Sequence, residues 1–203
     1  MREPAGCCGC VGLRPSYGAV SRFGMIAYAS SMDTVGTLSA TVADAAALLR
    51  ILQRPSPRDA TSAAAKPFSG CPEIDPTALR IGVLAPEHPQ TAAAARALQR
   101  RGAHVFPARF DALSVCADVY ESIALCEATL NLGRFDGIRF GADAPQPTGN
   151  ALSVLPSLCG LPALAVPFGR EAGGLCGSVT LCGAAFSEGL LLSLGMLLEQ
   201  EGK

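Results

Sequence analysis

The chain contains no tryptophan and few aromatic or charged residues, which make up 5% and 16% of its 203 positions. An excess of either charge is also missing, since 16 lysines and arginines face 17 aspartates and glutamates and leave a formal net charge of −1. This balance predicts no overall electrostatic attraction to nucleic acid or to an anionic membrane surface. Contact with a nucleic acid is therefore expected to be weak, local or made through a partner.

Long hydrophobic runs are missing too. A membrane-spanning helix needs ~20 apolar residues, and the best candidate, Gly189 to Leu198, is about half that length. The first residues show no apolar segment of the kind found in secretory signals. We therefore expect no membrane partner and a location in the cytoplasm or an organelle matrix.

The nine cysteines do not form a disulfide or metal pattern. Their number is odd, and a chain of this size with 49% hydrophobic residues can build a core without disulfides, which favours free thiols in a reducing compartment. Cys7 and Cys10 form one Cys-x-x-Cys pair, but no second pair follows, and His88 and His104 are far away in the sequence. No metal site is predicted.

Helical and strand patterns alternate along the chain. A short strand near Cys10 is followed by a loop to Gly36, and a helix begins at Thr41, where Asp44 completes a pattern resembling a capping box. The other predicted elements are buried strand 79–84, helix 91–101, strand 103–106, helix 117–132, strands 161–168 and 178–182, and helix 187–200.

The order of these elements predicts an α/β fold with a mixed sheet flanked by helices. The succession of strand 79–84, helix 91–101 and strand 103–106 is typical of a parallel crossover unit. Residues 55–76 contain five prolines and no sustained periodicity, so we expect a surface connection that tolerates change.

Four groups of motifs occur in order along most of the chain. The first comprises Arg2–Ala5, Gly12–Gly24, Ala29–Asp33 and Thr41–Ala46. The second is Glu127–Ala128 with Asn131–Gly141, the third is Gly160–Pro167, and the fourth and weakest is Gly177–Gly183. Together these motifs resemble the amidase-signature family, and most closely the A subunits of glutamyl-tRNA(Gln) amidotransferases. The second group separates these A subunits from other amidases.

The resemblance implies a fold like the C-terminal part of the amidase-signature domain, with residues 1–203 forming a single partial domain. It also implies a subunit that releases ammonia from glutamine for the conversion of Glu-tRNA(Gln) to Gln-tRNA(Gln). The partners would be subunits B and C, and tRNA would be reached only through the complex. ATP and magnesium would be used by a partner subunit, and this chain would hold no cofactor.

The family's catalytic triad consists of a lysine and two serines, all upstream of the motif that starts here at Arg2. We therefore assign no catalytic residue to this chain, and Ser30 and Ser31 form no replacement because they lack a glycine turn and a base. The family also carries a long segment with an arginine that grips the glutamine carboxylate. Residues 142–150 replace it with a short link.

Two positions are candidates for contact with glutamine. Tyr120, or the neighbouring Glu121, falls where the family has a pair of tyrosines, and Asn150 falls near a family aspartate that binds the glutamine amine. We further expect the face of helix 117–132 that carries Tyr120 and Glu127 to lie against the loop between Gly12 and Ser31. Just beyond this helix, the arginine and aspartate at positions 134 and 136 are expected to be partly buried and paired.

Three functions remain open on the sequence. The chain is part of an amidotransferase A subunit that is completed by an upstream extension or by a separate N-terminal half docking on a sheet edge. Alternatively, it is a non-catalytic module that holds the partner subunit. A third interpretation is the remnant of another amidase-family hydrolase.

Overall fold

The computed structural model describes residues 1–62, 67–135, 150–171 and 174–202. Its larger sheet has four antiparallel strands in the order β2-β1-β5-β6. These strands are β1 (Val11–Arg14), β2 (Thr37–Ser39), β5 (Ala163–Arg170) and β6 (Cys176–Cys182). Leu13 of β1 is paired with Leu164 of β5, so the two ends of the chain meet in the middle of this sheet.

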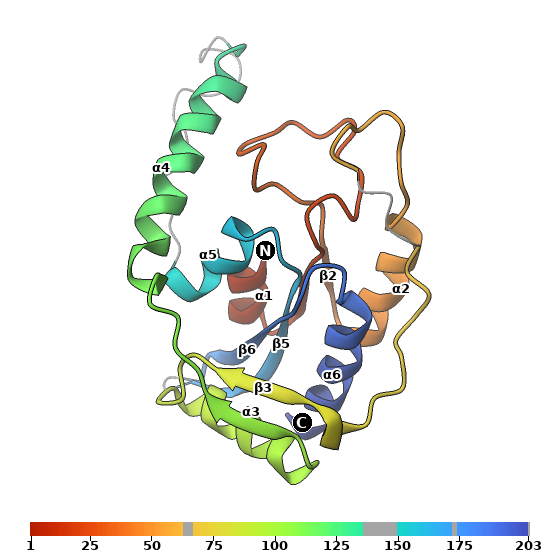
Figure 1. Ribbon diagram of the computed structural model, residues 1–203, viewed down its shortest axis with the longest axis vertical. Coiled ribbons are helices and arrows are strands. Elements are labelled where there is room, and N and C mark those ends of the chain that lie inside the picture. The colour runs from red at the N-terminus through yellow and green to blue at the C-terminus, as the bar shows by residue number, and fades with distance from the viewer. Residues whose placement is uncertain (63–66, 136–149, 172–173, 203) are drawn as a thin grey trace.

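Helices cover both faces of the larger sheet (Figure 1). Helices α2 (Val42–Leu52) and α6 (Glu188–Glu201) pack on one face. Helix α1 (Arg2–Cys8) packs on the other face, and α4 (Leu113–Leu132) and α5 (Ala151–Leu158) pack against each other beyond it. This arrangement confirms the α/β class with sheets flanked by helices.

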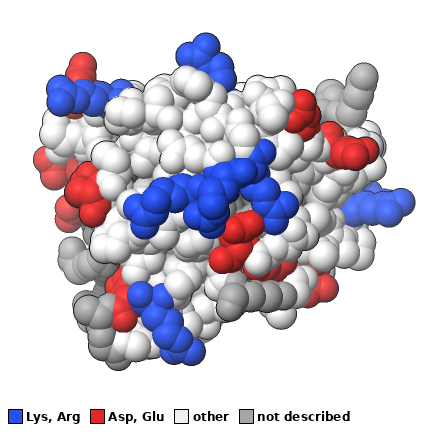
Figure 2. Space-filling model, turned by 90° about the horizontal axis from the view of Figure 1, so that it is seen from below, with Lys and Arg blue, Asp and Glu red and all other residues white. Residues whose placement is uncertain are grey.

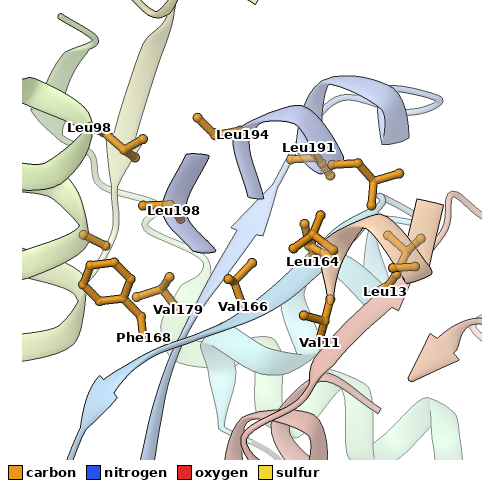
Figure 3. Close-up of a cluster of buried hydrophobic side chains, with 14 of the residues drawn as sticks. Val11, Leu13, Leu98, Leu164, Val166, Phe168, Val179, Leu191, Leu194 and Leu198 are labelled. Atoms are coloured by element: carbon orange, nitrogen blue, oxygen red, sulfur yellow. The ribbon is translucent and has the colours of Figure 1, made fainter. Parts of the chain in front are cut away.

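Alternate residues of strand β1 differ in size on the two faces of the sheet, and this difference explains how closely the helices pack on each face. Leu13 and Leu164 are fully buried beside α2 and α6, where apolar side chains from sheet and helices interdigitate (Figure 3). On the opposite face, a Cβ atom at Gly12 would lie 2.7 Å from the Cβ of Ala5 in α1. Small residues there allow the short α1 to lie close to the sheet.

A second, two-stranded sheet lies at the bottom of Figure 1. Strands β3 (Arg80–Val83) and β4 (His104–Pro107) are parallel and are joined by helix α3 (Pro89–Arg100), which confirms the predicted crossover unit. Leu98 of α3 belongs to the same core as the larger sheet. The prediction of a buried strand was wrong, because β3 alternates between exposed and half-buried residues and turns one face to solvent.

The cap of α2 is as predicted: Thr41 Oγ1 accepts a hydrogen bond of 3.1 Å from the backbone N–H of Asp44. Three other elements, α1, β2 and α5, were not predicted. Helix α1 and strand β2 are too short to show a period, and α5 contains Pro156, which usually argues against a helix interior.

The proline-rich connection lies at the surface, as predicted, since all its described residues are exposed or half-buried, and it is also anchored at several points. Its last part forms a 3-10 turn, η1 (Pro76–Ala78). Phe68, Cys71 and Ile74 pack against the main core, and Ser193 Oγ of α6 donates a hydrogen bond of 2.6 Å to the carbonyl of Pro72. The connection is therefore a surface segment tied to the core by a few side chains, and its tolerance to change stays a prediction.

All nine cysteines lie in the described residues and are free thiols, as predicted. Among the residues that the structure describes, no three His, Cys, Asp or Glu side chains are grouped to hold a metal ion. No helix in that part of the chain combines the length and the apolar character needed to cross a membrane.

Candidate functional site

The loop between β1 and β2 is held in shape by a network centred on Arg22. The guanidinium donates to the hydroxyl of Tyr17 over 2.8 Å and to the carbonyl of Ser30, and its central carbon lies 4.7 Å from the centre of the Tyr17 ring. The Tyr17 hydroxyl in turn donates to the carbonyl of Ser30 over 3.0 Å. These contacts fix a long irregular segment that would otherwise have no regular backbone pairing.

Asp59, in the proline-rich connection, ties this connection to the loop. Its carboxylate accepts hydrogen bonds from the backbone N–H of Arg22 over 2.7 Å and from the backbone N–H of Thr61 over 2.9 Å. The hydrogen bond from Arg22 and those from Thr61 lower the pKa of Asp59 to about 2. The ionised carboxylate is therefore the form that holds the two segments together.

We expect the Asp59→Asn variant to unfold at lower urea concentration than the parent chain at neutral pH. The native pKa of Asp59 is about 2 and its ordinary value is 3.8, so its stabilising effect is complete above pH 3.8 and is lost as the pH falls through about 2. The difference between the two unfolding midpoints should therefore shrink between pH 4 and pH 2. Asp118→Asn, on the exposed surface of α4, is the control, and a pH-independent difference for Asp59→Asn would contradict the assignment.

Helix α4 lies against this loop through its polar face, as predicted from the sequence. The carboxylate of Glu127 accepts a hydrogen bond of 2.9 Å from the backbone N–H of Ser31. The side-chain amide of Asn131 donates to the carbonyl of Tyr28 over 3.0 Å and to the hydroxyl of Ser30 over 2.9 Å. Segments about one hundred residues apart in sequence therefore form one surface.

Tyr120 lies on the same helix, one turn before Ala124. Its ring packs half-buried against a small apolar cluster made of Ala29, Met32 and Ala124. Burial raises the pKa of Tyr120, and the neighbouring Tyr28 adds to this effect. The phenol therefore stays protonated and can act as a hydrogen-bond donor at neutral pH.

Asn150 acts as the N-cap of α5, where its side-chain oxygen accepts a hydrogen bond of 2.9 Å from the backbone N–H of Ser153. Its exposed amide group remains available for other contacts. The rest of the short link, up to residue 149, lies outside the described residues.

The expectation for the end of α4 was wrong at Arg134. This side chain is exposed, and its guanidinium carbon lies 5.2 Å from the ring centre of Phe135. Because water can solvate this exposed charge, no carboxylate is needed to compensate it. Asp136 lies outside the described residues.

Two buried arginines lie between this face and the larger sheet. Arg14, at the end of β1, donates to the carbonyls of Leu161 over 3.0 Å and Met32 over 2.8 Å. Burial, and then the nearby charge of Arg2, lowers the pKa of Arg14 to about 10. Arg2 donates to the carbonyl of Ser153, which links α1 to α5. The sequence analysis did not identify either arginine as a buried residue that organises its neighbours. The signal that could have identified them is the presence of an arginine inside an otherwise apolar or glycine-rich motif.

This face is built from polar contacts between α4 and the loop. It presents hydroxyl, amide and carboxylate groups from α4 and the loop, and Ser30 is bonded to the amide of Asn131, which is not a base. Among the described residues, the hydroxyl of Ser153 donates to the carboxylate of Glu3 over 3.3 Å at an exposed position, and no serine hydroxyl donates to a lysine or histidine side chain. The described residues of this face therefore supply polar groups but no activated nucleophile.

The sequence is similar to curated A subunits of bacterial amidotransferases. It is 35% identical over 159 residues to the glutamyl-tRNA(Gln) amidotransferase A subunit of Solidesulfovibrio magneticus, covering 72% of this chain and 33% of that protein. It is 41% identical over 155 residues to the corresponding protein of Myxococcus xanthus, covering 71% and 32%. The chain thus spans about a third of the length of the curated relatives it matches.

Solved structures share the fold. The A subunit of a glutamyl-tRNA(Gln) amidotransferase from Thermotoga maritima superposes with a TM-score of 0.81 at 24% identity, covering 99% of this chain and 60% of that one. A peptide amidase from Stenotrophomonas maltophilia gives a TM-score of 0.77 at 22% identity, covering 98% and 60%. Residues 1–152 match the model of the family described as Amidase. The chain therefore belongs to the amidase family.

Proposed function

We propose that this chain is the part of a glutamyl-tRNA(Gln) amidotransferase A subunit that shapes the glutamine site. In this role it holds glutamine beside a nucleophilic serine carried by another segment or polypeptide. The ammonia released there is used by a partner subunit, with ATP and magnesium, to amidate Glu-tRNA(Gln). Subunits B and C are the proposed partners, and the tRNA is reached through the complex.

The docking of α4 on the loop is the observation that supports this proposal. Glu127 and Asn131 belong to the motif that resembles A subunits more than other amidases, and they bond to Ser31 and Tyr28 in the amidase-like loop. The motif on α4, which resembles A subunits, and the motif in the loop, which resembles the whole amidase family, therefore form the same surface. The sequence similarity to several curated A subunits supports the same function.

We assign a substrate-binding role to Tyr120 and Asn150 within this proposal. The protonated phenol of Tyr120 offers a donor to an oxygen of glutamine, and the exposed amide of Asn150 offers both a donor and an acceptor. Neither residue transfers the acyl group.

A segment exchange tests the proposed function. Residues 1–135 would replace the corresponding segment in the Myxococcus xanthus relative, which is 41% identical over the matched region. Assembled with that organism's partner subunits, the chimera is expected to form Gln-tRNA(Gln) with glutamine as the amide donor. A chimera that hydrolyses C-terminal peptide amides faster than glutamine would support the alternative of another amidase, and a chimera that assembles without any glutamine turnover would support a purely binding module.

In the active chimera, Tyr120→Ala should raise the KM for glutamine about tenfold with a smaller change in kcat, because uniform binding is lost. Tyr120→Phe separates the hydroxyl from the ring: it keeps the packing against Ala29 and Met32 but removes the donor. If Tyr120→Ala left the KM unchanged, the tyrosine would be a packing residue only.

A further inference from the structure

The crossover unit concentrates positive charge that the net charge of the whole chain conceals. Between Arg80 and Arg109 there are five arginines and one glutamate, whereas the rest of the chain contains eleven basic and sixteen acidic residues. All five arginines have exposed side chains. The unit is therefore strongly basic within a chain whose net charge is −1.

Basic side chains gather on the side of the molecule that carries the crossover unit. Figure 2 shows a band of basic side chains across the face that lies at the bottom of Figure 1, where β3, α3 and β4 are found. Arg96 and Arg100 lie four positions apart on α3 and so share a helix face. The turn after α3 lies against η1, which precedes β3, since a Cβ atom at Gly102 would lie 2.8 Å from the side chain of Thr77.

The charges in this band are poorly compensated. Arg100 and Arg101 both pair with Glu201, at N–O distances of 3.1 Å and 2.8 Å. A single carboxylate therefore forms ion pairs with two guanidinium groups and neutralises only one of their two charges. The negative end of the helix dipole favours arginines in the last turn of α3, but this effect does not extend to Arg80 or to Arg96.

The side chains beside the arginines suit a nucleic acid. The guanidinium carbon of Arg80 lies 5.7 Å from the ring centre of Phe106. The ring centres of His104 and Phe106 are also 5.7 Å apart. Guanidinium groups bind phosphate through paired hydrogen bonds and stack on rings, and aromatic rings beside basic groups provide stacking positions for bases.

From these observations we propose that the face formed by β3, α3 and β4 binds the phosphate backbone of an RNA. The contact is electrostatic and independent of sequence, and it is separate from the α4 surface proposed to hold glutamine. The test of this proposal measures RNA binding and does not require ammonia release. A failure of the RNA proposal can therefore be distinguished from a failure of the proposed function.

Fluorescence anisotropy with a labelled tRNA transcript tests the proposal on the 203-residue chain. At 50 mM salt we expect a dissociation constant on the order of 10–100 μM, as for contacts that are not sequence-specific, and affinity should fall as salt rises. The double variant Arg96→Glu/Arg100→Glu should bind at least tenfold more weakly, with a slope of log affinity against log salt flatter by about two.

Arg50→Glu/Arg54→Glu is the matched control. It changes the net charge equally and has the same spacing, but its exposed arginines lie on and just after α2. We expect this control to weaken binding by less than threefold. Glu201→Gln should tighten binding about twofold to threefold, because it frees Arg100 and Arg101 from their carboxylate.

Equal losses in the two double variants would overturn the proposal, since they would show a general effect of net charge. So would a Glu201→Gln variant that binds no more tightly than the parent chain. Vesicles of phosphatidylcholine and phosphatidylserine serve as the competing probe. Sedimentation with these vesicles, without binding to the tRNA transcript, would identify a membrane surface and exclude the RNA.

Discussion

The 203-residue chain purified alone is expected to release no ammonia from glutamine above the buffer blank. The geometry of the α4 surface provides donors and acceptors but no activated nucleophile, because Ser30 is bonded to Asn131 and not to a base. Loss of an activated nucleophile lowers the rate by about six orders of magnitude in a well-studied serine hydrolase. A coupled ammonia assay with glutamine checks this, and release well above the blank would show a nucleophile that the resemblance does not include.

Adding a polypeptide that carries the family's lysine and two serines is expected to restore this activity if the two parts assemble. The control replaces the nucleophilic serine of the added polypeptide by alanine, which should abolish the restored rate while leaving assembly intact. Size-exclusion chromatography monitors assembly. Activity that survives the serine replacement would come from a contaminant or from a different site.

Leu164→Ala is expected to destabilise the protein by about 3–5 kcal/mol, since it removes a fully buried side chain from the middle of the sheet and leaves a cavity. Leu164 contacts α6 closely: a Cβ atom at Gly195 would lie 2.4 Å from its Cδ2 atom, so the helix backbone sits directly against this side chain (Figure 3). Such a loss is a large fraction of the ~5–15 kcal/mol that stabilises a typical domain.

Urea unfolding followed by circular dichroism measures the effect. Leu38→Ala is the matched control, because Leu38 lies in edge strand β2 with 55% of its surface exposed. It should change the free energy of unfolding by less than about 1 kcal/mol. Similar losses for the two variants would show that Leu164 is not at the centre of the core.

Elements with a strong local signal were predictable from the sequence. The cap at Thr41 and the apolar spacing after it indicated α2, and the strand, helix and strand from Arg80 to Pro107 indicated the crossover unit. The polar face of α4 was also predictable, because its residues recur at helical spacing. The local concentration of arginines on the crossover unit was present in the sequence, but the balanced total charge concealed it.

Other features depend on contacts between distant segments. Helix α1 is too short to be stable by itself, and it exists because Gly12 lets Ala5 lie close to the sheet. The anchoring of the proline-rich connection depends on Asp59 meeting the backbone of Arg22, which no local pattern encodes. Likewise, the exposure of Arg134 depends on how the end of α4 packs, which no local pattern encodes.

The sequence by itself therefore determined the fold class, most of the regular elements and the family, because hydrophobic periodicity, capping and ordered motifs are local properties of the chain. The tertiary structure alone decided how α4 meets the loop, where the buried arginines find their carbonyl partners and which surface is basic. These features require residues such as Ser31 and Glu127, separated by about one hundred positions, to come within hydrogen-bond distance. Side-chain packing of the whole chain sets such distances, and the spacing of residues along the sequence does not.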